Sequence, residues 1–369
     1  MHFLDPDLPP AASPIAPEAS AHPSGSEGRS LLAIVLAAGK GTRMRSERPK
    51  VLHALAGRTM LAHVLSGAQA AGATRLAVVA EPGGPGTLSE AGVREDVLRE
   101  VEAVAPGALV VPQAERLGTA HAVLAAREAL SGGADDVIVA FGDTPLVTAD
   151  TLRRLRAPLG RGAAVAILAF EAADPTGYGR LVGDGEAVRA IREEKDASAT
   201  ERRLTLCSAG LMALSGIHAL PLPARIGNAN AAGEYYLTDA VALAVADGLA
   251  VAVVRVAEDE AKGVNDRVQL AAAEAVMQAR LRHAAMLAGA TLVAPETVFL
   301  SADTVFGRDV VVEPHCVFGP GVTVGDGCIV RAFSHLERAT LDEGMSVGPY
   351  ARLPRGGAVR RAYGSPTSS

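Results

Sequence analysis

Short runs of aliphatic and β-branched residues alternate with amphipathic stretches from residue 31 to about residue 257. The apolar runs are typical of buried strands and lie at 31–37, 75–80, 108–112, 136–141 and 163–170. Apolar residues at helical spacing occupy 60–72, 93–104 and 119–130. This alternation predicts βαβ units, and therefore an α/β domain whose mainly parallel sheet is covered by helices on both faces. Ligands of such sheets bind at the carboxyl ends of the strands.

The simple alternation stops after residue 170. Two apolar segments, 178–182 and 187–192, flank Gly183-Asp184-Gly185, a pattern that is typical of a β-hairpin. We expect this hairpin to form one wall of a substrate pocket. An Ala-rich stretch at 266–287 has helical spacing and is followed by Gly289, which predicts a capped helix that links two domains.

Beyond Gly289 the apolar positions recur every six residues. They are Leu300, Phe306, Val312, Phe318, Val324, Val330 and Leu336, and after a slip near Leu341 the period returns at Val347 and Leu353. A six-residue repeat predicts a parallel β-helix, here left-handed, short and of about three coils. We therefore expect a disordered tail at 1–29, the α/β domain at 30–262, a linker helix at 263–289, the β-helix at 290–353 and an irregular tail at 354–369.

Composition narrows the classes of partner. The formal net charge of the 369 residues is only −6, so no strong field predicts nucleic-acid binding. The apolar runs are far shorter than the roughly 20 residues that a membrane-spanning helix needs, so we expect no membrane association. Three widely spaced cysteines show no metal-binding spacing and fit a reducing, cytoplasmic environment.

The first candidate for chemistry is the segment Gly39-Lys40-Gly41-Thr42-Arg43-Met44, which follows the first strand. A dinucleotide fingerprint requires a third glycine where Met44 stands, and a P-loop requires Lys-Ser or Lys-Thr after a longer loop, so both motifs are excluded. The small residues that end the strand let a nucleotide approach the backbone amides, and Arg43 and Lys50 supply positive charge. Taken alone, this loop is also consistent with an ordinary strand-to-helix turn that binds no ligand.

The wider pattern resembles the sugar nucleotidyltransferases. Leu36 to Met44, followed by Pro49-Lys50-Val51-Leu52, matches their nucleotide-binding opening, and further matches follow in order at 113–121, 142–146, 174–180, 194–197, 233–239 and 263–267. The set is most similar to the bacterial bifunctional N-acetylglucosamine-1-phosphate uridyltransferase and glucosamine-1-phosphate acetyltransferase family. The resemblance implies a Rossmann-like domain that joins UTP and N-acetylglucosamine-1-phosphate into UDP-N-acetylglucosamine and pyrophosphate, for peptidoglycan and lipopolysaccharide precursors. It also implies a homotrimer formed through the β-helix.

The match assigns roles residue by residue. We expect Arg43 and Lys50 to be catalytic, because charge neutralisation and positioning dominate nucleotidyl transfer. The resemblance implies that Mg²⁺ is bound by Asp143 and Asn265, since a carboxylate with phosphate oxygens suits this hard cation. The expected substrate-binding residues are Leu36, Ala37, Ala38, Gly39, Lys50, Gln113, Gly118, Thr119, Gly142 and Asp143 on the nucleotide side, and Gly179, Glu193, Ser208, Tyr236, Thr238 and Asn265 on the sugar side.

Two departures from the family leave alternatives open. Ser208-Ala209-Gly210 stands where the family carries Asn-Thr-Gly or Asn-Ser-Gly, so a long amide becomes a short hydroxyl. The repeats stop before the family's acetyltransferase site, and His315 and His335 match none of its motifs, so we expect a C-terminally shortened chain without acetyl transfer. The alternatives are a related enzyme with another sugar or base, and a non-catalytic remnant that binds ligands or forms oligomers.

Overall fold

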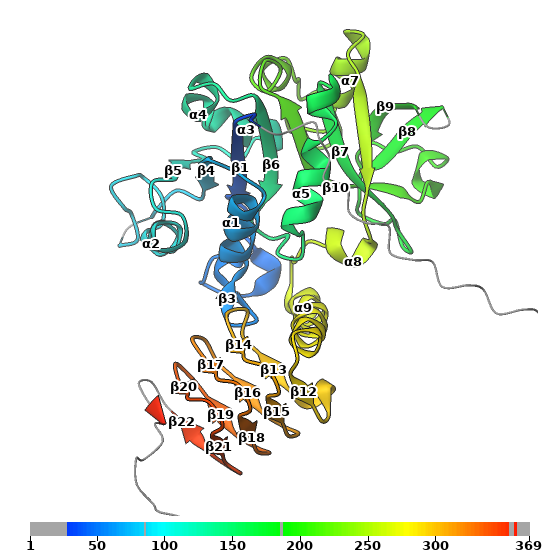
Figure 1. Cartoon of the computed structure of the whole chain (residues 1–369). Helices are drawn as coiled ribbons and strands as arrows, with labels where there is room; N and C mark the ends of the chain where they lie inside the picture. Colours follow the sequence, from blue (N-terminus) through cyan, green and yellow to red (C-terminus); the bar gives the residue numbers. More distant parts are fainter. Residues whose placement is uncertain (1–27, 85, 185–186, 354–357, 360–369) are drawn as a thin grey trace, which may run out of the picture.

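The computed structural model describes residues 28–84, 86–184, 187–353 and 358–359. An upper α/β body and a lower stack of short strands are joined by one long helix (Figure 1). This arrangement confirms the expected fold class, an α/β Rossmann-like domain followed by a β-helix. Residues 1–27 of the expected N-terminal tail lie outside the described residues.

The upper body contains a nine-stranded sheet. Its main path runs β11-β7-β10-β6-β1-β4-β5; off this path, β8 pairs with β10 and β9 pairs with β8. The strands are β1 (Leu31–Ala37), β4 (Arg75–Ala80), β5 (Leu109–Pro112), β6 (Asp136–Phe141), β7 (Val165–Glu171), β8 (Arg180–Asp184), β9 (Ala187–Arg192), β10 (Leu206–Ser215) and β11 (Val251–Arg255). All pairs along the path are parallel except those of β10, which runs antiparallel to β6 and β7.

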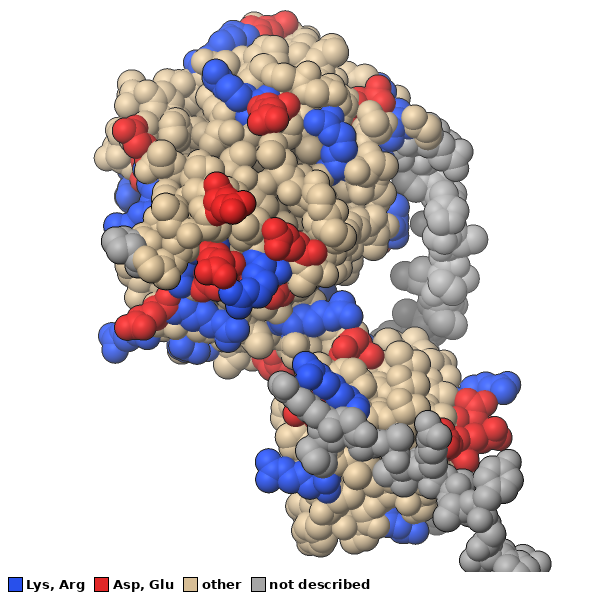
Figure 2. Space-filling view, turned by 90° about the vertical axis from the view of Figure 1, so that its left-hand side faces the viewer, with Lys and Arg blue, Asp and Glu red and all other residues tan. Residues whose placement is uncertain are grey.

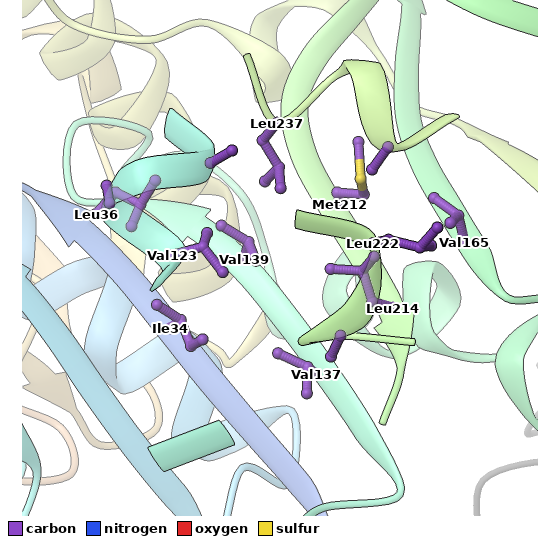
Figure 3. Close-up of a cluster of buried hydrophobic side chains, with 14 of the residues drawn as sticks. Ile34, Leu36, Val123, Val137, Val139, Val165, Met212, Leu214, Leu222 and Leu237 are labelled. Atoms are coloured by element: carbon purple, nitrogen blue, oxygen red, sulfur yellow. The ribbon is translucent and has the colours of Figure 1, made fainter. Parts of the chain in front are cut away.

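Both faces of the central strands are buried, which explains why β1, β4, β6 and β7 are apolar along most of their length. One face packs against α1 (Met60–Ala70), α2 (Glu95–Val104) and α5 (Ala149–Arg156). The other packs against α3 (Thr119–Ala125), α4 (Arg127–Ser131), α6 (Pro221–Ala224) and α7 (Asp239–Ala246). Figure 3 shows side chains of the second core, with Ile34 from β1 and Val139 from β6 close to Val123 of α3. The helix expected at 119–130 is divided at Ala126.

Two predicted connecting elements are present. Strands β8 and β9 form the expected antiparallel hairpin, although residues 185–186 of its turn lie outside the described residues. The expected linker helix is α9 (Arg267–Leu287), and the Asp266 side chain accepts a hydrogen bond from the Gln269 N–H at 2.8 Å to cap its start. A short hairpin of β2 (Ala54–Leu55) and β3 (Arg58–Thr59) lies between the helix and the strand stack.

The lower body is built from two-residue strands. Three parallel sheets contain β12, β15, β18 and β21, then β13, β16, β19 and β22, and then β14, β17, β20 and β23. The twelve strands are Thr291–Leu292, Phe299–Leu300, Val305–Phe306, Val311–Val312, Val317–Phe318, Thr323–Val324, Ile329–Val330, His335–Leu336, Thr340–Leu341, Ser346–Val347, Arg352–Leu353 and Ala358–Val359. The second residue of most of these strands points into a common apolar core.

The number of coils differs from the prediction of about three. Each sheet has four strands, so the described part of the stack holds four layers. The expected irregular tail at 354–369 is also partly wrong, because strand β23 pairs in parallel with β20. Val359 stands six residues after Leu353, so the period continues there. The rest of that tail, 354–357 and 360–369, lies outside the described residues.

Candidate functional site

Two loops meet where neighbouring parallel strands end. Strand β1 ends at Ala37 and β6 at Phe141, and the Gly142 N–H donates to the Leu36 carbonyl at 2.9 Å. A Cβ atom at Gly142 would lie 3.0 Å from the Val51 side chain, so glycine lets the two loops pass closely. This packing brings Asp143 beside the segment that carries Lys50.

The loop after β1 is folded by one glycine. Gly41 has a φ of 58°, and a Cβ atom there would lie 2.6 Å from the Lys50 Cβ. The loop continues through two short 3-10 helices, Thr42–Met44 and Lys50–Leu52. Met44 is buried, whereas the neighbouring Arg43 side chain is exposed and has no ion-pair or hydrogen-bond partner among the described residues. The loop thus holds Arg43 at the protein surface with its charge available.

Lys50, Asp143 and Asn265 converge on one point. The Lys50 ammonium donates to the Asp143 carboxylate and to the Asn265 Oδ1 at 3.0 Å. The backbone supports this geometry, because the Val264 N–H donates to the Asp143 carbonyl at 2.8 Å. Side chains 215 residues apart in the sequence are thereby brought within hydrogen-bond distance.

The donor set at this point suits Mg²⁺. A carboxylate oxygen and an amide oxygen that reach the same ammonium are hard ligands of the kind that this cation prefers. Among the described residues no group of three or more His, Cys, Asp and Glu side chains could hold a metal ion. The protein therefore offers two oxygens, and substrate phosphates and water would have to complete the coordination.

Two adjoining cavities share Asp143 and Thr119. The smaller, about 250 Å³, is lined by the expected nucleotide residues Leu36, Ala37, Ala38, Gly39, Lys50, Gln113 and Gly118. The larger, about 610 Å³, is lined by Arg43 and by the expected sugar residues Gly179, Glu193, Ser208, Tyr236, Thr238 and Asn265. Every expected site residue except Gly142, which lies just behind, lines one of the two. Asp143 therefore lies at the boundary of the two cavities.

The smaller cavity has a buried polar group at one wall. The Gln113 side chain is buried, and its Nε2 donates to the Gly118 carbonyl at 3.2 Å. Gly118 has a φ of 121°, and a Cβ atom there would lie 2.5 Å from the Tyr235 carbonyl oxygen. The Leu237 N–H donates to Thr119 Oγ1 at 2.8 Å, which ties the wall of one cavity to the wall of the other.

The larger cavity contains a half-buried carboxylate. Glu193 Oε1 accepts a hydrogen bond from Thr238 Oγ1 at 2.8 Å. Burial raises the pKa of the Glu193 carboxyl above its usual value, the hydrogen bond from Thr238 opposes this shift, and the nearby carboxylates of Asp239, Asp196 and Glu234 add to it. A half-buried acceptor of this kind can bind a sugar hydroxyl or amide N–H.

Ser208 also lines the larger cavity, and its polar groups bond to the nearby backbone. The Ser208 N–H donates to the Gly179 carbonyl at 2.8 Å, and Ser208 Oγ accepts from the Gly210 N–H at 3.1 Å. The pairing of β10 with β7 is irregular between Ser208 and Met212. The Ser208 hydroxyl therefore has a hydrogen-bond partner on its own strand, and its short side chain leaves space in the larger cavity.

Sequence reasoning missed several residues that line these cavities. Arg116 lies in the smaller one, where its Nε donates to the Ala38 carbonyl at 3.1 Å and its guanidinium pairs with Glu81. Phe141 and Glu234 line both cavities. Arg116 stands at the one variable position of the 113–121 match, so no sequence signal identified it. Glu234 stands within the 233–239 match, which could have identified it.

Replacing Glu193 by glutamine is expected to stabilise the ligand-free protein at pH 8. The folded protein raises the pKa of Glu193 above its value in the unfolded chain, about 4.3. The free energy of unfolding is therefore unaffected by ionisation of Glu193 at pH values below the unfolded pKa, and it falls as the pH rises through the folded pKa. Glutamine does not ionise and still accepts from Thr238. Melting curves should therefore show Glu193→Gln above the wild type at pH 8 and level with it below pH 4; an equal difference at both pH values would contradict this.

Comparison with known proteins follows the same division of the chain. Residues 33–206 match the model of a MobA-like NTP transferase domain, and residues 303–338 match that of the bacterial transferase hexapeptide (six repeats). The bifunctional protein GlmU of Xanthobacter autotrophicus is 65% identical over 325 residues, which cover 88% of this chain and 70% of the relative. The chain belongs to the GlmU family. The GlmU protein of Azorhizobium caulinodans is 62% identical, and the match covers 89% of this chain and 71% of that protein. The GlmU protein of Nitrobacter hamburgensis is 58% identical, and the match covers 85% of this chain and 67% of that protein.

Membership of the GlmU family, together with the NTP transferase match, makes this chain a nucleotidyltransferase of the sugar-1-phosphate uridyltransferase type with hexapeptide repeats. Lys50, Asp143 and most of the smaller cavity lie within the matched residues 33–206, whereas Asn265 and part of the larger cavity, including Tyr236 and Thr238, lie beyond them. Within the described residues, no helix has both the length and the apolarity needed to cross a membrane.

Proposed function

We propose that the chain transfers UMP from UTP to N-acetylglucosamine-1-phosphate, with release of pyrophosphate. The observation that carries the proposal is the junction of two cavities at Asp143, beside Lys50 and Asn265. The smaller cavity takes the nucleotide and the larger one takes the sugar phosphate. Their common boundary is the place where the two substrates meet.

The reaction needs little acid-base assistance. A phosphate oxygen of the sugar-1-phosphate attacks the α-phosphorus of UTP, the new P–O bond forms, and the bond to the β-phosphate oxygen breaks to release pyrophosphate. The attacking phosphate is already an anion near pH 7, so orientation and charge neutralisation dominate. Arg43 and Lys50 neutralise the triphosphate. Asp143 and Asn265 would hold Mg²⁺, which would supply Lewis-acid polarisation of the phosphoryl oxygens.

Base and sugar recognition follow from the two walls. The Gln113 amide has one N–H engaged with Gly118 and retains a second N–H and an acceptor oxygen, which complement the uracil edge. Glu193 and Thr238 supply polar partners to the sugar hydroxyls or the acetamido group. Tyr236 and Gly179 complete the sugar wall.

A substrate panel tests this proposal. Pyrophosphate release is measured with UTP, CTP, ATP, GTP and dTTP against N-acetylglucosamine-1-phosphate, glucose-1-phosphate and N-acetylgalactosamine-1-phosphate in the presence of Mg²⁺. The proposal requires the largest kcat/KM for UTP with N-acetylglucosamine-1-phosphate. Preference for another pair would replace it with a related specificity, and no release with any pair would favour a non-catalytic binding protein.

Replacing Ser208 by asparagine is expected to lower the KM for the sugar phosphate. The longer amide reaches into space that Ser208 leaves in the larger cavity and adds a hydrogen bond worth about 0.5–1.5 kcal/mol, or about 2- to 10-fold in KM. Steady-state kinetics with varied N-acetylglucosamine-1-phosphate measures it, and Ser215→Asn at the far end of β10 serves as the control. An unchanged or higher KM in Ser208→Asn would contradict the assigned role.

The proposed assembly is a homotrimer through the β-helix. The surface of the β-helix carries exposed apolar side chains, including Phe299, Val305 and Phe333. The Phe333 ring stacks between the rings of His315 and Tyr350, whose centroids lie 4.9 and 5.2 Å from its own. Figure 2 shows wide uncharged areas on the lower body. Exposed apolar patches of this kind support association between copies. Light scattering after size-exclusion chromatography measures the molar mass.

Two further expectations remain proposals. The chain is expected to lack acetyl transfer, and adding glucosamine-1-phosphate and acetyl-CoA to the substrate panel tests this directly. A cytoplasmic location is supported by three buried cysteines, Cys207, Cys316 and Cys328, none of which forms a disulfide.

A further inference from the structure

The tip of the β2–β3 hairpin is held between α9 and the β-helix (Figure 1). The Ala56 N–H donates to Glu274 Oε2 of α9 at 2.7 Å, and the Ala56 carbonyl accepts from the Ala302 N–H of the β-helix at 2.8 Å. Ala56 and Gly57 have φ values of 45° and 77°, which shape the turn. Both backbone groups of one turn residue are thus bound by the lower half of the molecule.

Glu274 also links the helix to the first coil. Its Oε1 accepts from Gln278 Nε2 at 2.8 Å. Gln278 is only 3% exposed and bonds to both backbone groups of Leu300, donating to the carbonyl at 2.7 Å and accepting from the N–H at 2.8 Å. One continuous chain of hydrogen bonds therefore runs from the hairpin through Glu274 to strand β13, and it satisfies its buried polar groups.

The hairpin and α9, which these hydrogen bonds join, are continuous with two of the segments that present site residues. Lys50 opens the short helix that leads directly into the hairpin, Asn265 precedes α9 by two residues, and Asp143 precedes Leu146 by three. A separate buried cluster lies among these segments and contains Leu55, Met60, Leu146, Val264 and Ala273. Each of the three segments contributes a side chain to this cluster, and Glu274 follows Ala273 directly.

We propose that Glu274 is a positioning residue for nucleotidyl transfer, and that through it the β-helix acts as a brace for the transferase site. Glu274 holds the hairpin against α9 and so sets the spacing of Lys50 from Asn265 and Asp143. It touches no substrate and lines neither cavity. The inference rests on the proposed function, since it assigns Glu274 a part in the same site.

The test uses Glu274→Ala and Glu274→Gln in the full chain, with His283→Ala on the exposed side of the same helix as the control. A misplacement of the site by a fraction of an ångström is expected to lower kcat about 10-fold in Glu274→Ala, with the KM for the sugar phosphate changed less than about twofold. Glu274→Gln keeps one acceptor oxygen but sets an amide donor against donors, so its effect should be intermediate.

A second readout does not depend on turnover. Mn²⁺ binding to the substrate-free protein is measured by electron paramagnetic resonance, and hydrogen exchange follows the amides of residues 50–59. In Glu274→Ala we expect Mn²⁺ to bind several-fold more weakly and these amides to exchange faster, while His283→Ala matches the wild type in both.

Wild-type kcat, Mn²⁺ affinity and exchange in a folded Glu274→Ala protein would overturn the inference. If Glu274→Ala fails to fold, the same measurements on Glu274→Gln decide the question. If the wild type forms no product from UTP and N-acetylglucosamine-1-phosphate, the proposed function fails. The Mn²⁺ and exchange data then still show whether Glu274 positions Lys50, Asp143 and Asn265.

Discussion

Replacing Asp143 by asparagine is expected to lower kcat for UDP-N-acetylglucosamine formation by roughly 10²–10³-fold. Asparagine keeps the size of the side chain and one oxygen, but it removes the negative charge at the point where the two cavities meet. The charge is needed because the Asp143 carboxylate is the one anionic protein ligand proposed for Mg²⁺, which in turn neutralises the phosphates. Product formation is measured at saturating UTP and sugar phosphate over a range of Mg²⁺ concentrations.

The matched control for this variant is Asp150→Asn. Asp150 lies in the first turn of α5, is largely exposed, and pairs with Arg153 on the surface. We expect Asp150→Asn to retain wild-type turnover. We expect both variants to remain folded, which melting curves check, because asparagine retains an oxygen that can accept from the Lys50 ammonium at this largely buried pair. Turnover within threefold of the wild type in a folded Asp143→Asn protein would remove Asp143 from the proposed mechanism.

Replacing Arg43 by alanine is expected to reduce kcat by about 10²-fold with little change in stability. The Arg43 side chain is exposed, lines the larger cavity, and makes no ion pair or hydrogen bond within the described part of the chain. Its charge is therefore free to meet the triphosphate as charge develops at the α-phosphorus. Single-turnover product formation separates this step from release of pyrophosphate.

Arg45→Ala provides the comparison for Arg43. Arg45 is a nearby exposed arginine of the same loop, but it lines neither cavity. Its replacement should leave kcat within about twofold of the wild type, since a charge outside the site acts only through screened solvent. Equal losses in the two variants would mean that the general charge of the loop matters rather than the position of Arg43.

Most of the architecture could be predicted because the hydrophobic period reports directly on secondary structure. Runs such as 31–37 and 136–141 are apolar on both faces, as parallel strands between two helix layers must be. The six-residue period of the lower body predicts the positions of its short strands, because one inward-facing residue occurs on each side of every coil. Both signals are local in sequence, so no tertiary information was needed.

Features set by long-range pairing could not be predicted in the same way. Strand β10 runs antiparallel in the middle of a parallel sheet, and its apolar residues look the same in either direction. The break at Ala126 interrupts a stretch whose apolar spacing is helical throughout. Val359 keeps the six-residue period, but the preceding Pro354-Arg355-Gly356-Gly357 does not resemble a repeat and hides the period in the sequence.

The site shows the same division. Gln113, Asp143 and Asn265 stand in recognisable motifs, and the structure brings them to two adjoining cavities. Arg116 stands at a variable position of its motif and Glu274 stands outside the recognised motifs, because their importance comes from partners such as Ala38 and Ala56 that only the folded chain places beside them. Motifs identify groups that touch ligands, whereas groups that position the site appear only in three dimensions.

The most direct measurement follows product formation by the purified full chain from UTP, N-acetylglucosamine-1-phosphate and Mg²⁺. Mass spectrometry identifies the sugar nucleotide, and a coupled assay quantifies pyrophosphate. The proposal predicts UDP-N-acetylglucosamine and pyrophosphate in equal amounts, with no product when any one component is omitted and almost none in Asp143→Asn. Absence of the sugar nucleotide in the complete mixture, or equal formation by Asp143→Asn, would contradict it.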